Sequence, residues 1–137
     1  MWLFTDKAFV SAVQSPTDPD MIVVRARAEI HLYDFIRSNK DINVENMLVT
    51  PERDYPYRIF LTRDQFKSLM IEAIDDLNYF DFKSHCKADE RFHRHHLEAM
   101  TDVWGIMYDS QKRPYTHQGT AYINRHTAKR ELGLGPF

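Results

Sequence analysis

The stretch from residue 21 to residue 37 most constrains the fold, because its hydrophobic period changes there from that of a strand to that of a helix. Residues 21–27 read MIVVRAR, in which inward and outward positions alternate as in a half-buried strand. In residues 28–37 the apolar side chains recur instead at helical spacing, which predicts an amphipathic helix. The chain therefore combines strands with helices.

The remaining elements follow the same two patterns. Thr62 and Gln65 fit a capping box, in which the two side chains satisfy backbone N–H groups at the start of a helix. The aromatic segment 78–83 (NYFDFK) predicts a turn, and Pro114 ends the last long helix. The predicted strands are residues 2–5, 8–14, 21–27, 47–50 and 57–61, and the predicted helices are residues 28–37, 62–77 and about 89–111.

This order predicts an α+β fold, in which an antiparallel sheet has helices packed on one face, ferredoxin-like or related, plus an added C-terminal helix and a basic tail. The 137 residues suit one domain, which we place at residues 1–111, with the tail at residues 112–137. The longest apolar runs are far shorter than the ~20 residues that span a bilayer. A single cysteine, Cys86, cannot form an internal disulfide. We therefore expect a cytoplasmic protein with no membrane partner.

Charge is unevenly distributed between the predicted domain and its tail. Residues 1–111 contain 13 Lys and Arg against 19 Asp and Glu, a net charge of −6. Residues 112–137 contain five basic residues against Glu131 alone, a net charge of +4. The tail would therefore pack against its own acidic domain, which we favour, or bind a partner's acidic surface or a nucleic-acid backbone.

The segment 84–97, SHCKADERFHRHHL, holds four of the seven histidines and the only cysteine. On a helix that begins near Asp89, His93 and His96 lie on one side. Together with Cys86 they would form a zinc site. No paired ligand motif such as C-x-x-C or H-E-x-x-H accompanies them. The alternative is that these histidines are packed rings, each with one hydrogen bond.

Arginines gather on one face of the predicted sheet. Arg25 and Arg27 point away from the apolar positions of their strand, Arg58 and Phe60 do the same in theirs, and Tyr55 in the adjoining loop reaches the edge of this face. Guanidinium groups bind phosphate oxygens, and aromatic rings stack on bases, so we predict a site for an anion, a nucleotide or nucleic acid. The alternative is pairing of these arginines with neighbouring carboxylates, namely Glu29, Glu52 and Asp54.

The chain shows no complete catalytic constellation. Cys86, near histidines, is a conceivable thiolate nucleophile, but its surroundings match no nucleophile motif. With only four glycines, the chain has no glycine-rich phosphate loop. Asp75 and Asp76 are expected on the solvated side of their helix. We therefore expect a binding protein rather than an enzyme.

A family resemblance is carried by the start MWLFT with Phe9–Ser11, and by Met21–Arg27 (MIVVRAR), Asp54–Arg58 (DYPYR), Tyr79–Lys83 (YFDFK) and Asp102–Gln111 (DVWGIMYDSQ). These segments resemble a family of small uncharacterised conserved proteins of bacterial and phage genomes. The resemblance implies no activity and no functional residue. It leaves out the histidine-rich stretch 85–96 and the tail after Arg113. A phage origin would imply a host factor or a signalling nucleotide as partner.

Three functions fit these observations. The first, which we favour, is a non-enzymatic cytoplasmic binding protein with a site for a phosphate-bearing ligand or nucleic acid on its arginine-bearing sheet face. The second is a protein–protein interaction module, such as an inhibitor of a host protein, that uses surface aromatics and the basic tail. The third is a small metal-dependent enzyme at the His/Cys cluster. Salt separates the first two, because phosphate contacts weaken steeply as salt is added.

Overall fold

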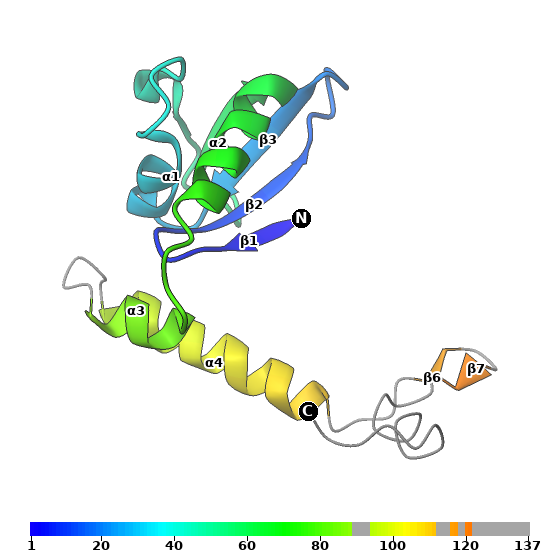
Figure 1. The fold of residues 1–137 in the computed structure, drawn as a ribbon. Helices are drawn as coiled ribbons and strands as arrows, with labels where there is room; N and C mark the ends of the chain where they lie inside the picture. The colour runs from blue at the N-terminus through cyan, green and yellow to red at the C-terminus, as the bar shows by residue number, and fades with distance from the viewer. Residues whose placement is uncertain (89–93, 112–115, 118–119, 122–137) are drawn as a thin grey trace. The chain divides into compact units, whose positions relative to one another are not determined.

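The computed structural model describes residues 1–88, 94–111, 116–117 and 120–121 (Figure 1). The chain divides into two compact units, Met1–Phe92 and His93–Phe137, which we describe separately. The first unit contains β1 (Trp2–Phe4), β2 (Phe9–Gln14), β3 (Met21–Ala26), α1 (Glu29–Ile36), the 3-10 turn η1 (Val44–Asn46), β4 (Leu48–Val49), β5 (Tyr57–Thr62), α2 (Arg63–Asp75) and α3 (Phe82–Ala88). The second unit contains α4 (Arg94–Ser110), β6 (Thr116–His117) and β7 (Thr120–Ala121).

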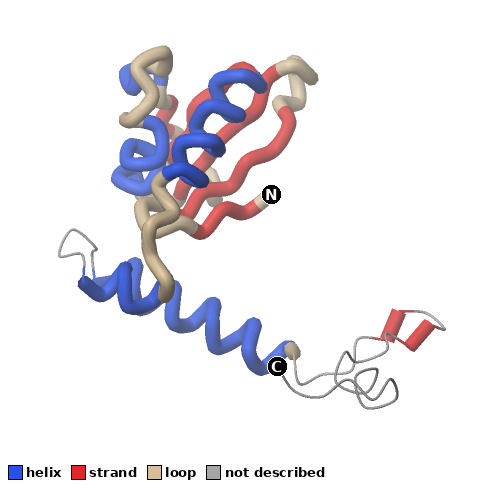
Figure 2. The backbone as a smooth tube through the Cα atoms, viewed as in Figure 1, coloured by secondary structure: helices blue, strands red, loops and turns tan. Residues whose placement is uncertain are grey.

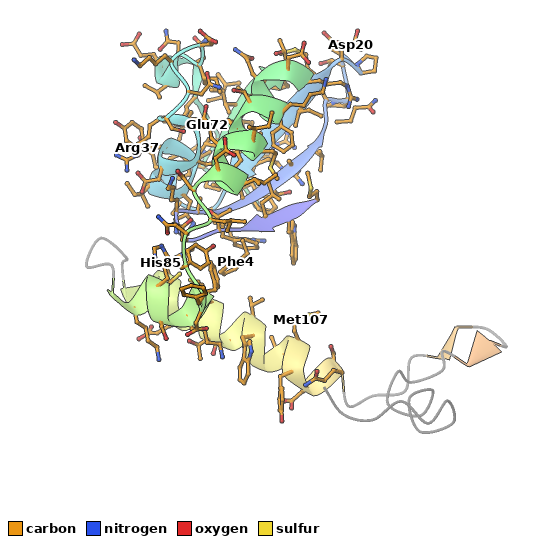
Figure 3. The ribbon with its side chains drawn as sticks, viewed as in Figure 1. Phe4, Asp20, Arg37, Glu72, His85 and Met107 are labelled. Atoms are coloured by element: carbon orange, nitrogen blue, oxygen red, sulfur yellow. The ribbon has the colours of Figure 1, made fainter. Side chains whose placement is uncertain are left out.

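Five strands of the first unit form one antiparallel sheet in the order β1-β2-β3-β5-β4 (Figure 2). Short turns join β1 to β2 and β2 to β3, and Phe4 and Asp20 mark opposite ends of the sheet (Figure 3). The chain then passes through α1 to the edge strand β4 and returns as β5 between β4 and β3. The predicted α+β class is confirmed. The element order βββαββα is that of a related fold rather than of the βαββαβ ferredoxin-like unit.

α1 and α2 cover one face of this sheet (Figure 1). The strand residues beneath them are small or branched, so the helices approach closely and water is excluded from the interface. Each fully buried branched side chain contributes roughly 1.5–3 kcal/mol through the area that it removes from water. The buried core consists of Ala8, Val10, Ala12, Val24, Ala26, Leu32, Phe35, Ile36, Ile42, Ile59, Leu61 and Leu69.

α2 begins at the capping box that the sequence predicts. The Oγ1 atom of Thr62 accepts a hydrogen bond from the backbone N–H of Gln65 at 3.1 Å. The Oε1 atom of Gln65 accepts one from the backbone N–H of Thr62 at 2.9 Å. Because both bonds satisfy donors that lack an intrahelical partner, they determine where β5 ends and α2 begins.

The prediction of a turn over residues 78–83 is wrong in its second half, because α3 begins at Phe82. The carboxylate of Asp81 accepts hydrogen bonds from the Ser84 hydroxyl and, at 3.0 Å, from the Ser84 backbone N–H. These two bonds hold the pKa of Asp81 below its ordinary value. An aspartate cap thus starts a helix of seven residues, too short for its hydrophobic period to show in the sequence.

α4 is the long helix of the second unit. His96 and Met100 are buried, and the ring of Trp104 stacks on that of Tyr108 with centroids 5.2 Å apart. Val103, Ile106 and Met107 of this helix are exposed. No helix in the described part of the chain has both the length and the apolar content that crossing a membrane requires.

Several predictions concern residues that the structure does not describe. The predicted helix start at residues 89–93 is one of them, and most of the basic tail at residues 112–137 is another. The short pair of β6 and β7 is the described part of that tail. The predicted domain boundary at residue 111 stays a prediction.

Candidate functional site

One row of side chains crosses all five strands on the sheet face opposite α1 and α2. Residues directly opposite each other in an antiparallel ladder share a face. The register pairs Trp2 with Ser11, Ser11 with Arg25, Arg25 with Arg58, and Arg58 with Leu48. The sheet therefore places two arginines next to each other at its centre, on β3 and β5, as the sequence predicts.

Aromatic side chains flank this row on both sides. Phe60 lies two residues beyond Arg58 on β5, and Phe9 lies two residues before Ser11 on β2, so both share the face of the row. Phe9 contacts Trp2 edge-to-face, with centroids 5.7 Å apart. Trp2 is 69% exposed and Phe60 is 40% exposed. We call this surface the arginine face, and its residues are Trp2, Phe9, Ser11, Arg25, Leu48, Arg58 and Phe60.

Tyr55, in the loop between β4 and β5, organises the arginines. Its ring is only 8% exposed and lies against two guanidinium groups, with Arg25 Cζ at 4.7 Å and Arg27 Cζ at 4.3 Å from the ring centroid. Its backbone carbonyl accepts a hydrogen bond from Arg58 Nη2 at 2.8 Å. Tyr55 thus holds the three arginines in place, and its predicted contact with a ligand stays a prediction.

Arg27 follows the alternative that the sequence leaves open, because it pairs with a carboxylate. Its Nη2 atom donates to both carboxylate oxygens of Asp54, each at 3.1 Å, and its Nη1 atom donates to the Tyr55 hydroxyl at 3.2 Å. The charge of Arg27 is therefore balanced locally. Arg27 helps to hold the loop that carries Tyr55, and we place it beside the site rather than at its centre.

Arg25 and Arg58 differ from Arg27 in their charge balance. Neither forms an ion pair with any carboxylate of the residues that the structure describes. Arg25 donates to the Oγ atom of buried Ser11, from Nε at 3.4 Å and from Nη2 at 3.1 Å. The Nε atom of Arg58 is buried, and no described residue accepts a hydrogen bond from it. Within the part of the chain that the structure describes, two neighbouring positive charges thus lack a negative partner.

The contribution of β1 and β2 to this face was not predicted from the sequence. The sequence does contain a signal for it, because the alternation that places Arg25 and Arg58 on the outer faces of their strands applies to β1 and β2 as well. It predicts that Trp2 and Phe4 share one face of their strand, and that Phe9 and Ser11 share one face of theirs. What the alternation does not reveal is which face of one strand joins which face of the next. The pairing register supplies that connection.

The three predicted zinc ligands fall in different parts of the chain, which the structure describes separately. Cys86 is buried in α3 of the first unit, His96 is buried in α4 of the second, and His93 lies outside the described residues. Within the described residues, no group of three or more His, Cys, Asp or Glu side chains is arranged to hold a metal ion. The zinc hypothesis therefore stays a prediction that the described geometry does not support.

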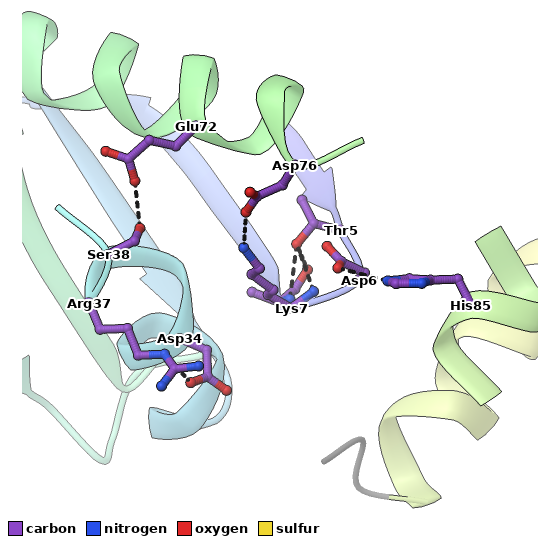
Figure 4. A network of polar contacts seen from close by, with 10 residues as sticks. Thr5, Asp6, Lys7, Asp34, Arg37, Ser38, Glu72, Asp76 and His85 are labelled. Atoms are coloured by element: carbon purple, nitrogen blue, oxygen red, sulfur yellow. Dashed lines mark hydrogen bonds and ion pairs between the residues drawn. The ribbon is translucent and has the colours of Figure 1, made fainter. Parts of the chain in front are cut away.

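A second polar region surrounds the β1–β2 turn and the ends of α1 and α2 (Figure 4). Four carboxylates line a pocket there, and each has a partner. These contacts hold the turn, both helices and α3 together, so each of the four carboxylates has a structural role there. The pairs are Asp76 with Lys7, Asp34 with Arg37 at 3.0 Å, Glu72 with Ser38 at 2.6 Å, and Asp6 with His85 at 3.2 Å.

His85 belongs to this fastening region rather than to a metal site. Its ring stacks on Tyr79, with centroids 4.4 Å apart, while its Nε2 atom faces Asp6. Burial raises the pKa of the Tyr79 hydroxyl, and the nearby charges of Asp6 and Cys86 raise it further. The contact with Asp6 holds α3 to the β1–β2 turn, and the stack holds it to the connection between α2 and α3.

No protein-family model, curated protein or solved structure matches this chain. The fold and the site together define a small α+β protein with an arginine-bearing sheet face. The resemblance to bacterial and phage proteins stays a hypothesis.

Proposed function

We propose that this is a non-enzymatic binding protein of the cytoplasm whose arginine face holds a phosphate-bearing ligand, a nucleotide or nucleic acid. One observation carries the proposal. Arg25 and Arg58 are direct neighbours across β3 and β5, and no carboxylate of the described residues pairs with either.

An anion between these arginines would remove an energetic cost. Like charges directly opposite each other in a sheet destabilise it, by roughly 0.2–1 kcal/mol. A phosphate replaces this repulsion with charge-assisted hydrogen bonds, each worth about 1.5–3 kcal/mol.

The site is also preorganised. Arg25 is held by Ser11 and by the Tyr55 ring, and Arg58 is held by the Tyr55 carbonyl. Binding therefore orders fewer side-chain rotamers than it would with unrestrained arginines, which lowers the entropic cost of association. By holding both arginines in place, Tyr55 thus supports binding.

Calorimetric titration tests this proposal with three probes: tripolyphosphate, ATP and a twelve-residue oligothymidylate. We expect at least one of them to bind at low salt. Combined replacement of Arg25→Gln and Arg58→Gln should weaken that binding at least tenfold, since each lost contact costs about 1.5–3 kcal/mol. Arg37→Gln is the matched control, because Arg37 pairs with Asp34 on α1 and should leave binding unchanged. Equal binding by the wild type and the double variant would refute the proposal.

A second candidate function is protein–protein interaction through α4. Its exposed apolar side chains favour this candidate, since Trp104, Ile106 and Met107 are each half exposed or more. Such an interface would persist at about 0.5 M salt, where charge contacts are screened, and would not need Arg25 or Arg58. Partner binding that survives this salt and is lost with Trp104→Ala would support it.

A further inference from the structure

We infer that the ligand of the arginine face is single-stranded nucleic acid, with phosphates at Arg25 and Arg58 and bases stacked on Trp2 and Phe60. This inference rests on the proposed function and specifies its ligand.

The aromatic rings lie on two different sides of the arginine pair. Trp2 lies in the same row as Arg25 but two strands away, and Phe60 lies two residues along β5 from Arg58. Strand spacing of about 4.8 Å and a rise of about 3.3 Å per residue place these backbone positions roughly 10 Å and 7 Å apart, respectively. A mononucleotide carries one base and would use one ring at most. A ligand that uses both rings and the arginines between them needs at least two bases.

The exposure of these rings also indicates stacking on bases. Trp2 and Phe60 are 69% and 40% exposed, although both belong to the sheet. Stacking of a base on an exposed ring contributes about 1–3 kcal/mol, and it is available only to bases that are not already stacked in a duplex. A sheet face that combines such rings with arginines is therefore suited to single-stranded nucleic acid.

The charge distribution of the chain bears on which basic residues would contact the phosphates of the nucleic acid. The part of the chain up to residue 111 has a net charge of −6, so long-range attraction to a polyanion is absent there. Two phosphate contacts on a single strand predict a slope of about −1.4 for log K against log salt concentration. Binding through the five basic residues of the tail instead predicts about −3.5. The salt slope therefore distinguishes the arginine face from the tail.

The experiment compares a twelve-residue oligothymidylate with an abasic oligomer of the same length and charge, by fluorescence anisotropy. We expect the oligothymidylate to bind roughly 5- to 100-fold more tightly, because only it has bases to stack. Trp2→Ala and Phe60→Ala should each reduce this difference, whereas Trp2→Phe, which keeps a ring, should retain most of it. Phe80→Ala is the control, since Phe80 is fully exposed in the connection between α2 and α3.

Direct evidence for stacking comes from tryptophan fluorescence. Trp104→Phe leaves Trp2 as the only tryptophan of the chain. We expect the oligothymidylate to quench Trp2 emission in this variant, and the abasic oligomer to leave it unchanged. Oligodeoxyuridylate and oligouridylate in parallel, which differ only at the 2′ position of the sugar, test whether the sugar matters.

The outcomes separate the inference from the proposed function. Equal binding of both oligomers, lost in the Arg25→Gln and Arg58→Gln double variant, would overturn the inference and leave the proposed function standing. Absence of oligomer binding would overturn the inference, and absence of tripolyphosphate and ATP binding as well would overturn the proposed function. Binding of any of these probes that is indifferent to the arginines would overturn both. Tighter binding of poly-glutamate than of the oligothymidylate would overturn the inference in favour of an acidic protein partner.

Discussion

The two faces of the five-stranded sheet are built from the same strands but differ in chemistry. Toward α1 and α2 the strands present residues such as Val10, Val24 and Ile59, all nearly inaccessible to solvent. Toward the other side they present the arginine face, with Trp2 and Arg58. The strands β2, β3 and β5 thus divide alternate residues between the core and the arginine face.

This difference teaches that neighbouring positions in one strand have separable effects. Ile59 and Arg58 are adjacent in β5, yet Ile59 belongs to the core and Arg58 to the arginine face. Substitution at one should change folding, and substitution at the other should change binding.

Ile59→Ala tests the core face. We expect the free energy of unfolding to fall by about 2–5 kcal/mol, because the truncation removes buried apolar area and leaves a cavity against the helices. Urea denaturation followed by circular dichroism measures this loss. A loss below about 1 kcal/mol would show that the helix side does not dominate stability.

The effect of a ligand on the melting temperature tests the arginine face. A ligand that binds only the native state, at a hundred times its dissociation constant, stabilises it by about 2.7 kcal/mol. We expect oligothymidylate to raise the melting temperature of the wild-type protein and to leave that of the Arg25→Gln and Arg58→Gln double variant unchanged. An equal rise in both proteins would place the ligand elsewhere.

Thr62→Ala weakens the start of α2 and leaves the two arginines and the rings of Trp2 and Phe60 unaltered. Loss of the capping box should lower the free energy of unfolding by about 1 kcal/mol, since an N–H at the start of α2 loses its acceptor. Thermal denaturation measures the change, and affinity for oligothymidylate should stay the same. A parallel loss of affinity would show that the two faces are coupled.

Arg58→Gln should have the smallest effect on folding. It removes the hydrogen bond to the Tyr55 carbonyl, but it also relieves repulsion with Arg25. These effects oppose each other, so we expect the free energy of unfolding to change by less than about 1 kcal/mol. Urea denaturation at low and high salt checks this, because salt screens only the repulsion. A loss like that of Ile59→Ala would assign Arg58 a structural role.

The sequence predicts the arginine face in part. Alternation in residues 21–27 and 57–61 places Arg25, Arg58 and Phe60 away from the core, and the register confirms their common face. Alternation depends on the backbone alone, which is why it is readable from the chain. It does not tell which arginine a carboxylate neutralises, and Asp54 reaches Arg27 only because the loop folds back beside β3.

Local patterns in the sequence determined the strands, the capped start of α2 and the alternation of core and surface positions, because each depends on residues a few positions apart. Tertiary structure alone decided that β5 lies between β3 and β4, that Trp2 joins the row of the two arginines, and that Tyr55 orients them. These features depend on contacts between segments distant in the chain. Such contacts form only when burial of the common core brings those segments together.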